Sequence, residues 1–144
     1  MNGKVLLGTC GSDVHSVANN LVEKCLVDIG IQVRNLGVAV SMTEWVNATA
    51  EFNPDLLMVG SMNGDLQPLV ELVSSIVDVG YQPNQIIVGG KLRLGSDGPS
   101  LIPFIAASGV HVIESENPTF AELQRIVSSK LMNINVEVNA NFAR

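Results

Sequence analysis

The 144-residue sequence is poor in charge and especially poor in basic residues. Charged residues make up 15% of it and hydrophobic residues 47%, whereas a disordered chain has few apolar residues and many charges. Eight lysines and arginines stand against fourteen acidic residues, which gives a formal net charge of −6. With basic residues so few and so scattered, we expect neither a nucleic-acid-binding protein nor a membrane-surface protein.

Long apolar runs and a cysteine framework are missing as well. No run approaches the roughly 20 apolar residues that cross a bilayer. The chain begins Met-Asn-Gly-Lys directly before a strand-like segment, so we expect no signal peptide. Cys10 and Cys25 have no spacing typical of a metal site or a disulfide. These features predict a cytoplasmic protein with no membrane partner.

What the sequence does contain is a regular alternation of strand-like and helix-like segments. Short apolar runs that end at glycine or at polar residues predict strands at 4–9, 31–36, 55–60, 86–88 and 110–113. Apolar residues at helical spacing predict a helix after each strand, and two of these helices begin with a capping box, Ser41 with Glu44 and Thr119 with Glu122. Such alternation favours parallel strands joined by right-handed crossovers. We therefore predict a three-layer, doubly wound, flavodoxin-like (Rossmann-type) α/β fold whose five-stranded parallel sheet has the order 2-1-3-4-5.

The end of the chain differs in composition from the rest. In residues 132–144, four asparagines are interspersed with Ile134, Val136 and Val138. This pattern fits a frayed tail, an added edge strand or a docking strip, and we favour the frayed tail. We predict one domain over residues 1–131 and a C-terminal tail over residues 132–144.

Glycines and polar residues gather after the first, third and fourth predicted strands, where ligands bind in an open parallel sheet. Asp13 and His15 are two residues apart in the first of these loops. Asp13 can accept a hydrogen bond from one imidazole nitrogen and leave the other as a metal ligand. Asp13 or Ser16 can instead cap the following helix, which is the commoner role for such residues. His111 alternates with valines in a predicted core strand and is expected to be structural.

The segment Gly11-Ser12-Asp13-Val14-His15-Ser16-Val17-Ala18 resembles the D-x-H-x-x-G signature of cobalamin-binding domains. The similarity continues in order and spacing at residues 33–38, 60–64 and 88–92, and it covers the chain up to about Leu131. The sequence resembles in particular the cobalamin-binding small subunits of the glutamate mutase (methylaspartate mutase) family.

In that family the histidine replaces dimethylbenzimidazole as the lower cobalt ligand, the aspartate hydrogen-bonds the histidine, and the displaced nucleotide tail enters between the loops. The resemblance thus implies adenosylcobalamin as cofactor, His15 as the ligand of its cobalt and Asp13 as the partner of His15. The other cofactor-binding residues that it implies are Ser12, Val14, Ser16, Val17, Ala18, Gly60, Ser61, Met62, Asn63, Gly64, Gly89, Gly90 and Lys91.

Two positions depart from the family pattern. Ala18 replaces the glycine of D-x-H-x-x-G and adds a methyl group where the tail enters. Gly60-Ser61-Met62 replaces the usual S-x-L, so Gly60 lacks the hydroxyl that bonds the tail, and Ser61 is a candidate substitute. Met62 is similar in volume to leucine. We expect these changes to alter cofactor affinity more than the identity of the cofactor.

The resemblance implies an isomerase subunit that interconverts glutamate and 3-methylaspartate. It implies that this chain holds the cofactor and joins a larger barrel subunit, for example in a heterotetramer, and that it is not catalytic alone. One alternative is a corrinoid methyl-carrier protein, although such carriers usually place a helical domain before D-x-H and here Asp13 lies near the start. The other is a degenerate flavodoxin-like regulatory or interaction domain without cofactor, which Ala18 and Gly60 leave open. A phosphorylated receiver would need a lysine after the fifth strand, where Glu114 stands.

Overall fold

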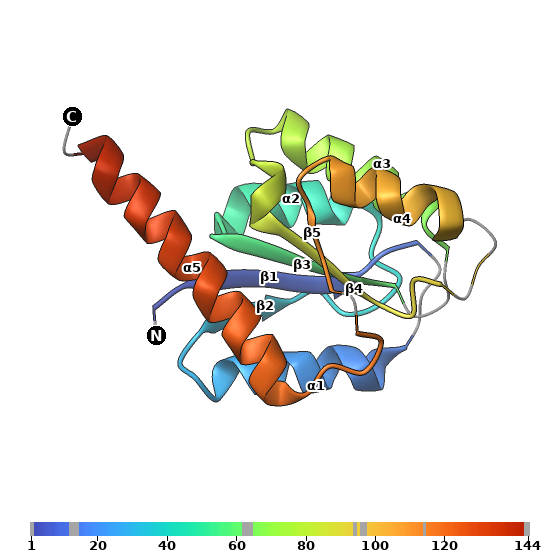
Figure 1. Ribbon diagram of the computed structural model, residues 1–144, viewed down its shortest axis with the longest axis horizontal. Coiled ribbons are helices and arrows are strands. Elements are labelled where there is room, and N and C mark those ends of the chain that lie inside the picture. Colours follow the sequence, from blue (N-terminus) through green and yellow to red (C-terminus); the bar gives the residue numbers. More distant parts are fainter. Residues whose placement is uncertain are drawn as a thin grey trace.

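The computed structural model describes residues 2–11, 15–61, 65–93, 95, 98–113 and 115–142. A parallel sheet forms its centre, with strands β1 (Lys4–Thr9), β2 (Gln32–Asn35), β3 (Leu56–Ser61), β4 (Ile86–Gly90) and β5 (His111–Val112). The strands lie in the order β2-β1-β3-β4-β5, and every neighbouring pair is parallel. β1 and β3 are buried almost throughout, as expected for strands covered on both faces. The predicted doubly wound α/β fold and its strand order are confirmed (Figure 1).

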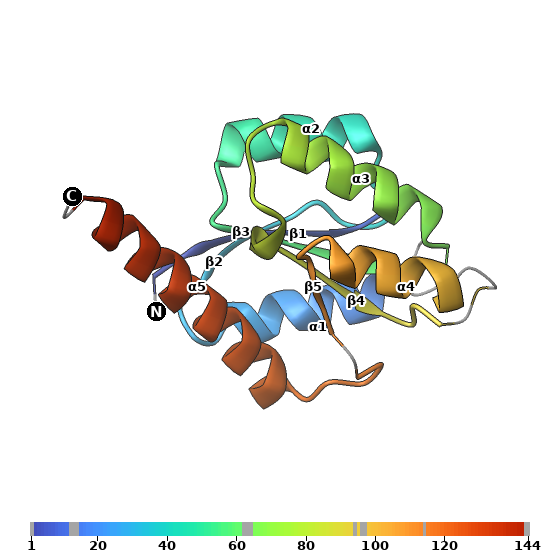
Figure 2. The same cartoon turned by 45° about the horizontal axis from the view of Figure 1, so that its top comes forward.

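Helices cover both faces of the sheet. In the described segments they are α1 (Ser16–Val27), α2 (Met42–Phe52), α3 (Gln67–Asp78), the short 3-10 helix η1 (Pro83–Gln85), α4 (Gly98–Ala107) and α5 (Phe120–Phe142). α1 and α5 lie on one face, and α2, α3 and α4 lie on the other (Figures 1 and 2). None of the helices in these segments is long and apolar enough to cross a membrane.

The sheet separates two hydrophobic cores. Leu7, Met58 and Ile87 belong to the core beneath α1 and α5, together with Leu26 and Val127 of those helices. The residues that precede or follow them on each strand, such as Leu6, Leu57 and Val88, belong to the core beneath α2, α3 and α4. Because successive side chains of a strand point to opposite faces, this alternation fixes which strand residues face each layer.

Local signals in the sequence account for several helix ends. The Ser41 hydroxyl accepts a hydrogen bond from the Glu44 backbone N–H at 3.2 Å and so caps α2. Asn53 ends the same helix in a left-handed conformation, with φ of 51°. Gly30 follows α1 with φ of 85°, a conformation that glycine adopts without strain.

The last helix is longer than the sequence predicts. We expect a helix that ends at Leu131 and a frayed tail, but α5 continues to Phe142 and extends past the end of the sheet (Figures 1 and 2). Residues 120–142 contain neither glycine nor proline, so nothing in the sequence ends the helix at Leu131. The expected helix end is therefore wrong, and the edge-strand alternative is wrong too. The division into a domain over 1–131 and a tail over 132–144 stays a prediction.

Candidate functional site

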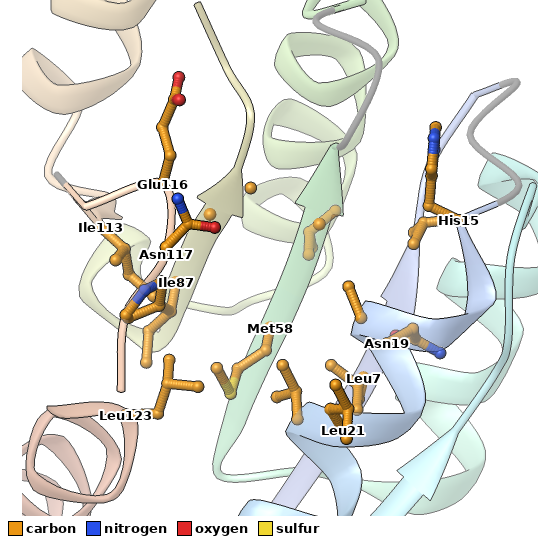
Figure 3. Close-up of a pocket in the computed structure, with 18 of the residues that line it drawn as sticks. Leu7, His15, Asn19, Leu21, Met58, Ile87, Ile113, Glu116, Asn117 and Leu123 are labelled. Carbon is orange, nitrogen blue, oxygen red and sulfur yellow. The ribbon is translucent and has the colours of Figure 1, made fainter. Parts of the chain in front are cut away.

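A cavity of about 280 Å³ opens between α1 and the beginning of α5, near the carboxyl ends of the strands. Its floor is aliphatic and comes from strand residues that face this layer, and its two walls come from the helices (Figure 3). The floor and walls include Leu7, Met58, Ile87, Ile113, Ala18, Leu21, Val22, Phe120 and Leu123. This is the place where an open α/β sheet binds its ligands.

Glycines at or next to the ends of two strands line the cavity. Gly60 of β3 and Gly89 and Gly90 of β4 all line it. A Cβ atom at Gly60 would lie 3.7 Å from Thr9 Cγ2, an ordinary contact, so a side chain there would project into the cavity without a clash. A Cβ atom at Gly89 would lie 3.2 Å from Ile113 Cδ1, and Gly90 has φ of 115°. A side chain at 89 would therefore need Ile113 to shift, backbone geometry favours glycine at 90, and neither effect opposes a side chain at 60.

His15 stands at the mouth of this cavity. It occupies the N-cap position of α1 but makes no capping hydrogen bond with its side chain, which is exposed. In Figure 3 its ring points away from the aliphatic floor and toward the open side. This placement suits an imidazole that binds a group resting over the strand ends. Asp13 lies outside the described residues, so its predicted hydrogen bond to His15 stays a prediction.

A buried amide network holds α1 in position. Asn19, which is 6% exposed and lines the cavity, donates from Nδ2 to Asn35 Oδ1 at 2.6 Å. Asn35 Oδ1 also accepts from the Gly37 N–H, and Asn35 Nδ2 donates to Glu23 Oε2 at 3.1 Å. These bonds connect the first turns of α1 to the end of β2. The start of α1, which carries His15, is thereby held relative to the sheet.

Thr9 connects the cavity to the opposite core. Its Oγ1 accepts a hydrogen bond from the Ala39 N–H at 3.0 Å, and its carbonyl accepts one from Trp45 Nε1 at 3.3 Å. Thr9 lines the cavity and is 2% exposed, while Trp45 is fully buried on α2. The last residue of β1 is therefore fixed from the far side of the sheet.

The wall opposite His15 comes from the loop between β5 and α5. Glu116, Asn117 and Pro118 line the cavity there, and Figure 3 shows Glu116 and Asn117 facing it from the side opposite His15. The sequence does not predict this wall, because the expected ligand loops follow the first, third and fourth strands. The acidic and amide residues after the fifth strand are the sequence feature that could have indicated this wall. Asn19 was also missed, since a polar residue on a helix is normally expected to face solvent.

The predicted site residues other than Ser61 divide into three groups. His15, Ala18, Gly60, Gly89 and Gly90 come together around the cavity. Ser16 and Val17 are exposed on α1, Lys91 follows β4, and none of the three lines the cavity. Ser12, Asp13, Val14, Met62, Asn63 and Gly64 lie outside the described residues.

Ser61 is buried on the far side of the sheet. It follows Gly60 on β3, and successive strand residues face opposite layers. It is 1% exposed and does not line the cavity. The structure therefore does not bring its hydroxyl to the position that a serine at 60 would occupy.

Among the described residues, three titratable groups have clearly shifted pKa values, and none of the three lines the cavity. Burial, with a smaller contribution from Asp28, raises the pKa of Cys25, whose thiol donates to the Phe120 carbonyl. Burial, with a smaller contribution from Asp55, raises the pKa of Tyr81. Burial, with a smaller contribution from Lys130, lowers the pKa of His111. These shifts keep all three groups neutral near pH 7, which fits structural roles.

Comparisons with known proteins identify the family of this chain. The model of the B12 binding domain matches residues 3–94. The glutamate mutase sigma subunit of Carboxydothermus hydrogenoformans is 35% identical over 95 residues, which cover 63% of this chain and 67% of that protein. The sigma subunit of Treponema denticola is 32% identical over 96 residues, which cover 64% and 67%.

Solved structures share the fold at lower identity. A cobalamin-binding protein from Desulfitobacterium hafniense superposes with a TM-score of 0.70 at 20% identity, covering 90% of this chain and 59% of that one. NtrX from Brucella abortus superposes with a TM-score of 0.73 at 15% identity, covering 100% and 30%. At such identities the likeness shows the fold alone. The sequence matches carry the assignment: the resemblance to the small subunits of glutamate mutase is confirmed, and the chain belongs to the family of B12-binding domains.

Proposed function

We propose that this chain is the cobalamin-binding subunit of an adenosylcobalamin-dependent carbon-skeleton mutase that interconverts glutamate and 3-methylaspartate. The observation that carries the proposal is the position of His15 at the mouth of an apolar cavity in a B12-binding domain. In this proposal a larger barrel subunit binds the substrate, and the assembly is a heterotetramer in the cytoplasm. Cys10 and Cys25 are buried and form no disulfide, which suits that reducing compartment.

The residues of the site fit cobalamin. An imidazole nitrogen is a suitable donor for a transition metal such as cobalt. The cavity volume of about 280 Å³ lies near the lower end of small-molecule pockets, which suits the base of a nucleotide tail and is too small for a corrin ring. The glycines at 60, 89 and 90 leave room for that tail against the backbone.

Each part of this chain then has a separate task. His15 holds the cobalt, the Asn19 and Asn35 amides keep the start of α1 in place, and the aliphatic cavity encloses the tail away from water. Adenosylcobalamin, when bound, supplies the radical chemistry of the rearrangement. Arg34 is paired with Glu51 at 3.2 Å on α2, on the other side of the sheet, so the proposal leaves substrate carboxylates to the larger subunit.

A corrinoid methyl carrier is the second candidate. The methanol:cobalamin methyltransferase complex MtaBC from Methanosarcina barkeri shares the fold, with a TM-score of 0.58 at 20% identity. NtrX shares the fold as well, so the fold does not distinguish a mutase subunit from a methyl carrier. The sequence relatives named glutamate mutase sigma subunit favour the mutase.

Reconstitution tests the proposal. The chain is loaded with adenosylcobalamin, separated from free cofactor by gel filtration, and mixed with a purified large subunit of glutamate mutase. We expect a base-off, histidine-bound visible spectrum, and formation of 3-methylaspartate from glutamate only when both subunits are present. His15→Ala should lose the retained cofactor, while His111→Gln, a histidine outside the cavity, should keep it. Cofactor retention with methyl transfer from methylcobalamin, but no rearrangement, would support the carrier instead.

A further inference from the structure

We propose that residues 35–45, which run from the end of β2 into α2, clamp both ends of the chain segment that carries His15, and that Asn35 and Trp45 are positioning residues for cobalt binding. Neither of the two lines the cavity, so each acts through other residues. The inference rests on the proposed function, because it assumes that His15 binds cobalt. It concerns how this chain holds that histidine in place before the cofactor binds, which the family assignment leaves open.

The first end of the segment is Thr9, the last residue of β1, which is 2% exposed. Its N–H donates to the Gly37 carbonyl at 3.0 Å, and its carbonyl accepts from the Val40 N–H at 3.3 Å. Its Oγ1 accepts from the Ala39 N–H at 3.0 Å, and its carbonyl also accepts from Trp45 Nε1 at 3.3 Å. All four of these partners belong to residues 35–45, so that stretch fixes the point at which the chain leaves the sheet.

The second end is Asn19, which lies one turn after His15 on α1 and is 6% exposed (Figure 3). Its Nδ2 donates to Asn35 Oδ1 at 2.6 Å. The same oxygen accepts from the Gly37 N–H at 2.9 Å, and Gly37 is the residue whose carbonyl accepts from Thr9. A continuous hydrogen-bonded path therefore joins the residue before the histidine segment to the residue after it, and it runs through Asn35 and Gly37.

The backbone of this stretch departs from regular strand pairing. β1 pairs in register with β2 up to Asn35, but Cys10 then pairs with Val40, two residues later than that register predicts. The extra residues form a bulge, a feature that redirects neighbouring groups and is frequent beside active sites. Ala39 lies in it with φ of 50°, a conformation that is uncommon for residues other than glycine. The N–H of this residue is the one that donates to Thr9 Oγ1, so the unusual backbone is part of the clamp.

Trp45 supports the first end from the opposite face of the sheet. It is fully buried on α2, and a Cβ atom at Gly8 would lie 3.0 Å from its Cζ2 atom, so the ring rests directly on the backbone of β1. A segment that becomes ordered only when the cofactor binds weakens that binding, because its ordering opposes the gain from the new contacts. Loosening either end should therefore weaken the bond between His15 and cobalt without removing any group that touches the cofactor.

Two variants loosen one end each. Asn35→Ala removes the oxygen that accepts from Asn19. Trp45→Phe keeps an aromatic ring and removes the N–H that donates to the Thr9 carbonyl. Both residues lie outside the cavity, so neither change alters its lining.

Each variant has a matched control on the same element. Gln32→Ala changes an exposed residue at the other end of β2. Thr49→Val removes a hydroxyl of α2 that donates to the Trp45 carbonyl at 2.7 Å and not to β1. Thr49 is 2% exposed, so its replacement tests whether the loss of any buried hydrogen bond of α2 has the same effect.

Two quantities are measured on the purified chain. Calorimetry gives the dissociation constant of adenosylcobalamin, and electron paramagnetic resonance of protein labelled with [15N]histidine gives the share of bound cob(II)alamin whose signal is split by 15N. We expect Asn35→Ala and Trp45→Phe to raise the dissociation constant about three- to tenfold and to lower that share at saturating cofactor. Gln32→Ala and Thr49→Val should change the dissociation constant by less than about twofold and keep the wild-type share.

Wild-type values in either Asn35→Ala or Trp45→Phe would overturn the inference that both ends are held. An equal loss in Thr49→Val would overturn it as well, because the effect would then come from a general loosening of the fold. Absence of a 15N splitting in the wild type itself would contradict the proposed function, and the clamp would then have no cobalt ligand to position.

Discussion

Single side chains decide how the cavity is lined. Gly60 faces it from β3, and a Cβ atom there meets Thr9 Cγ2 at 3.7 Å without a clash. We predict that Gly60→Ser binds adenosylcobalamin about two- to tenfold more tightly, because its hydroxyl adds one hydrogen bond to the tail. Calorimetry on the purified chain measures the change. Gly89→Ser is the comparison variant, because it adds the same hydroxyl to the next strand. A Cβ atom at 89 would lie 3.2 Å from Ile113 Cδ1, so we expect this variant to lower the free energy of unfolding. Weaker binding by Gly60→Ser would contradict the predicted hydrogen bond, and unchanged binding would show that the tail does not pass this residue.

His111 gives the fold a dependence on pH. Burial first and Lys130 second lower its pKa, so the folded protein favours the neutral imidazole. Below the ordinary histidine pKa of about 6.5 the unfolded chain binds more protons than the folded chain, and stability falls as the pH drops. His111→Gln should therefore lose less stability than the wild type between about pH 7.5 and about pH 5.5. Urea unfolding followed by the fluorescence of Trp45, the single tryptophan, measures this difference. Parallel losses in the two proteins would exclude His111 as the source.

Among the elements, α5 is attached to the sheet through an apolar stripe made of Leu123, Val127 and Leu131. Leu131 is 2% exposed, and it packs so close to β1 that a Cβ atom at Gly3 would lie 2.7 Å from Leu131 Cδ1. Leu131→Ala should lower the free energy of unfolding by about 2–5 kcal/mol. Its neighbour Met132 is 59% exposed, so Met132→Ala should change it by less than about 0.5 kcal/mol. Urea unfolding of both variants measures this difference. Similar losses of free energy of unfolding in the two variants would mean that α5 is not held through this stripe.

Regular elements could be predicted from the sequence because their signals are local. β1 begins and ends at the predicted residues, Ser41 caps α2 as expected, and the strand order follows from the alternation of strands and helices. The end of α5 could not be predicted in the same way. Interspersed asparagines and apolar residues after Leu131 suggest an irregular segment, but without glycine or proline the backbone hydrogen bonds of the helix continue.

The site could be predicted only in part, because its remaining residues are brought together by tertiary packing. His15, Gly89 and Gly90 carry the family pattern, Ala18 and Gly60 replace other residues of that pattern, and all five line the same cavity. The Asn19 to Asn35 bond joins residues that no local pattern relates. Similarly, Glu116 and Asn117 reach the cavity only because α5 packs beside α1.

For the molecule as a whole, cofactor binding should be linked to folding. The cavity exists only when α1, α5 and the sheet are packed together, so a ligand that fills it binds the folded state alone. Adenosylcobalamin at 100 times its dissociation constant should raise the free energy of unfolding by about 2.7 kcal/mol. The same concentration should leave the stability of His15→Ala nearly unchanged. Thermal unfolding with and without cofactor checks this, and an equal gain in the variant would show that His15 does not hold the cofactor.

The central claim is that His15 ligates cobalt, and electron paramagnetic resonance of the chain loaded with cob(II)alamin tests it most directly. The chain has two histidines, so protein labelled with [15N]histidine is prepared with His111→Gln, which leaves the label at His15 alone. We predict that the nitrogen splitting of the cobalt signal changes from the pattern of 14N to that of 15N. A splitting that stays that of 14N would mean that the cofactor's own base, or no protein histidine, occupies the lower position, and it would contradict the account.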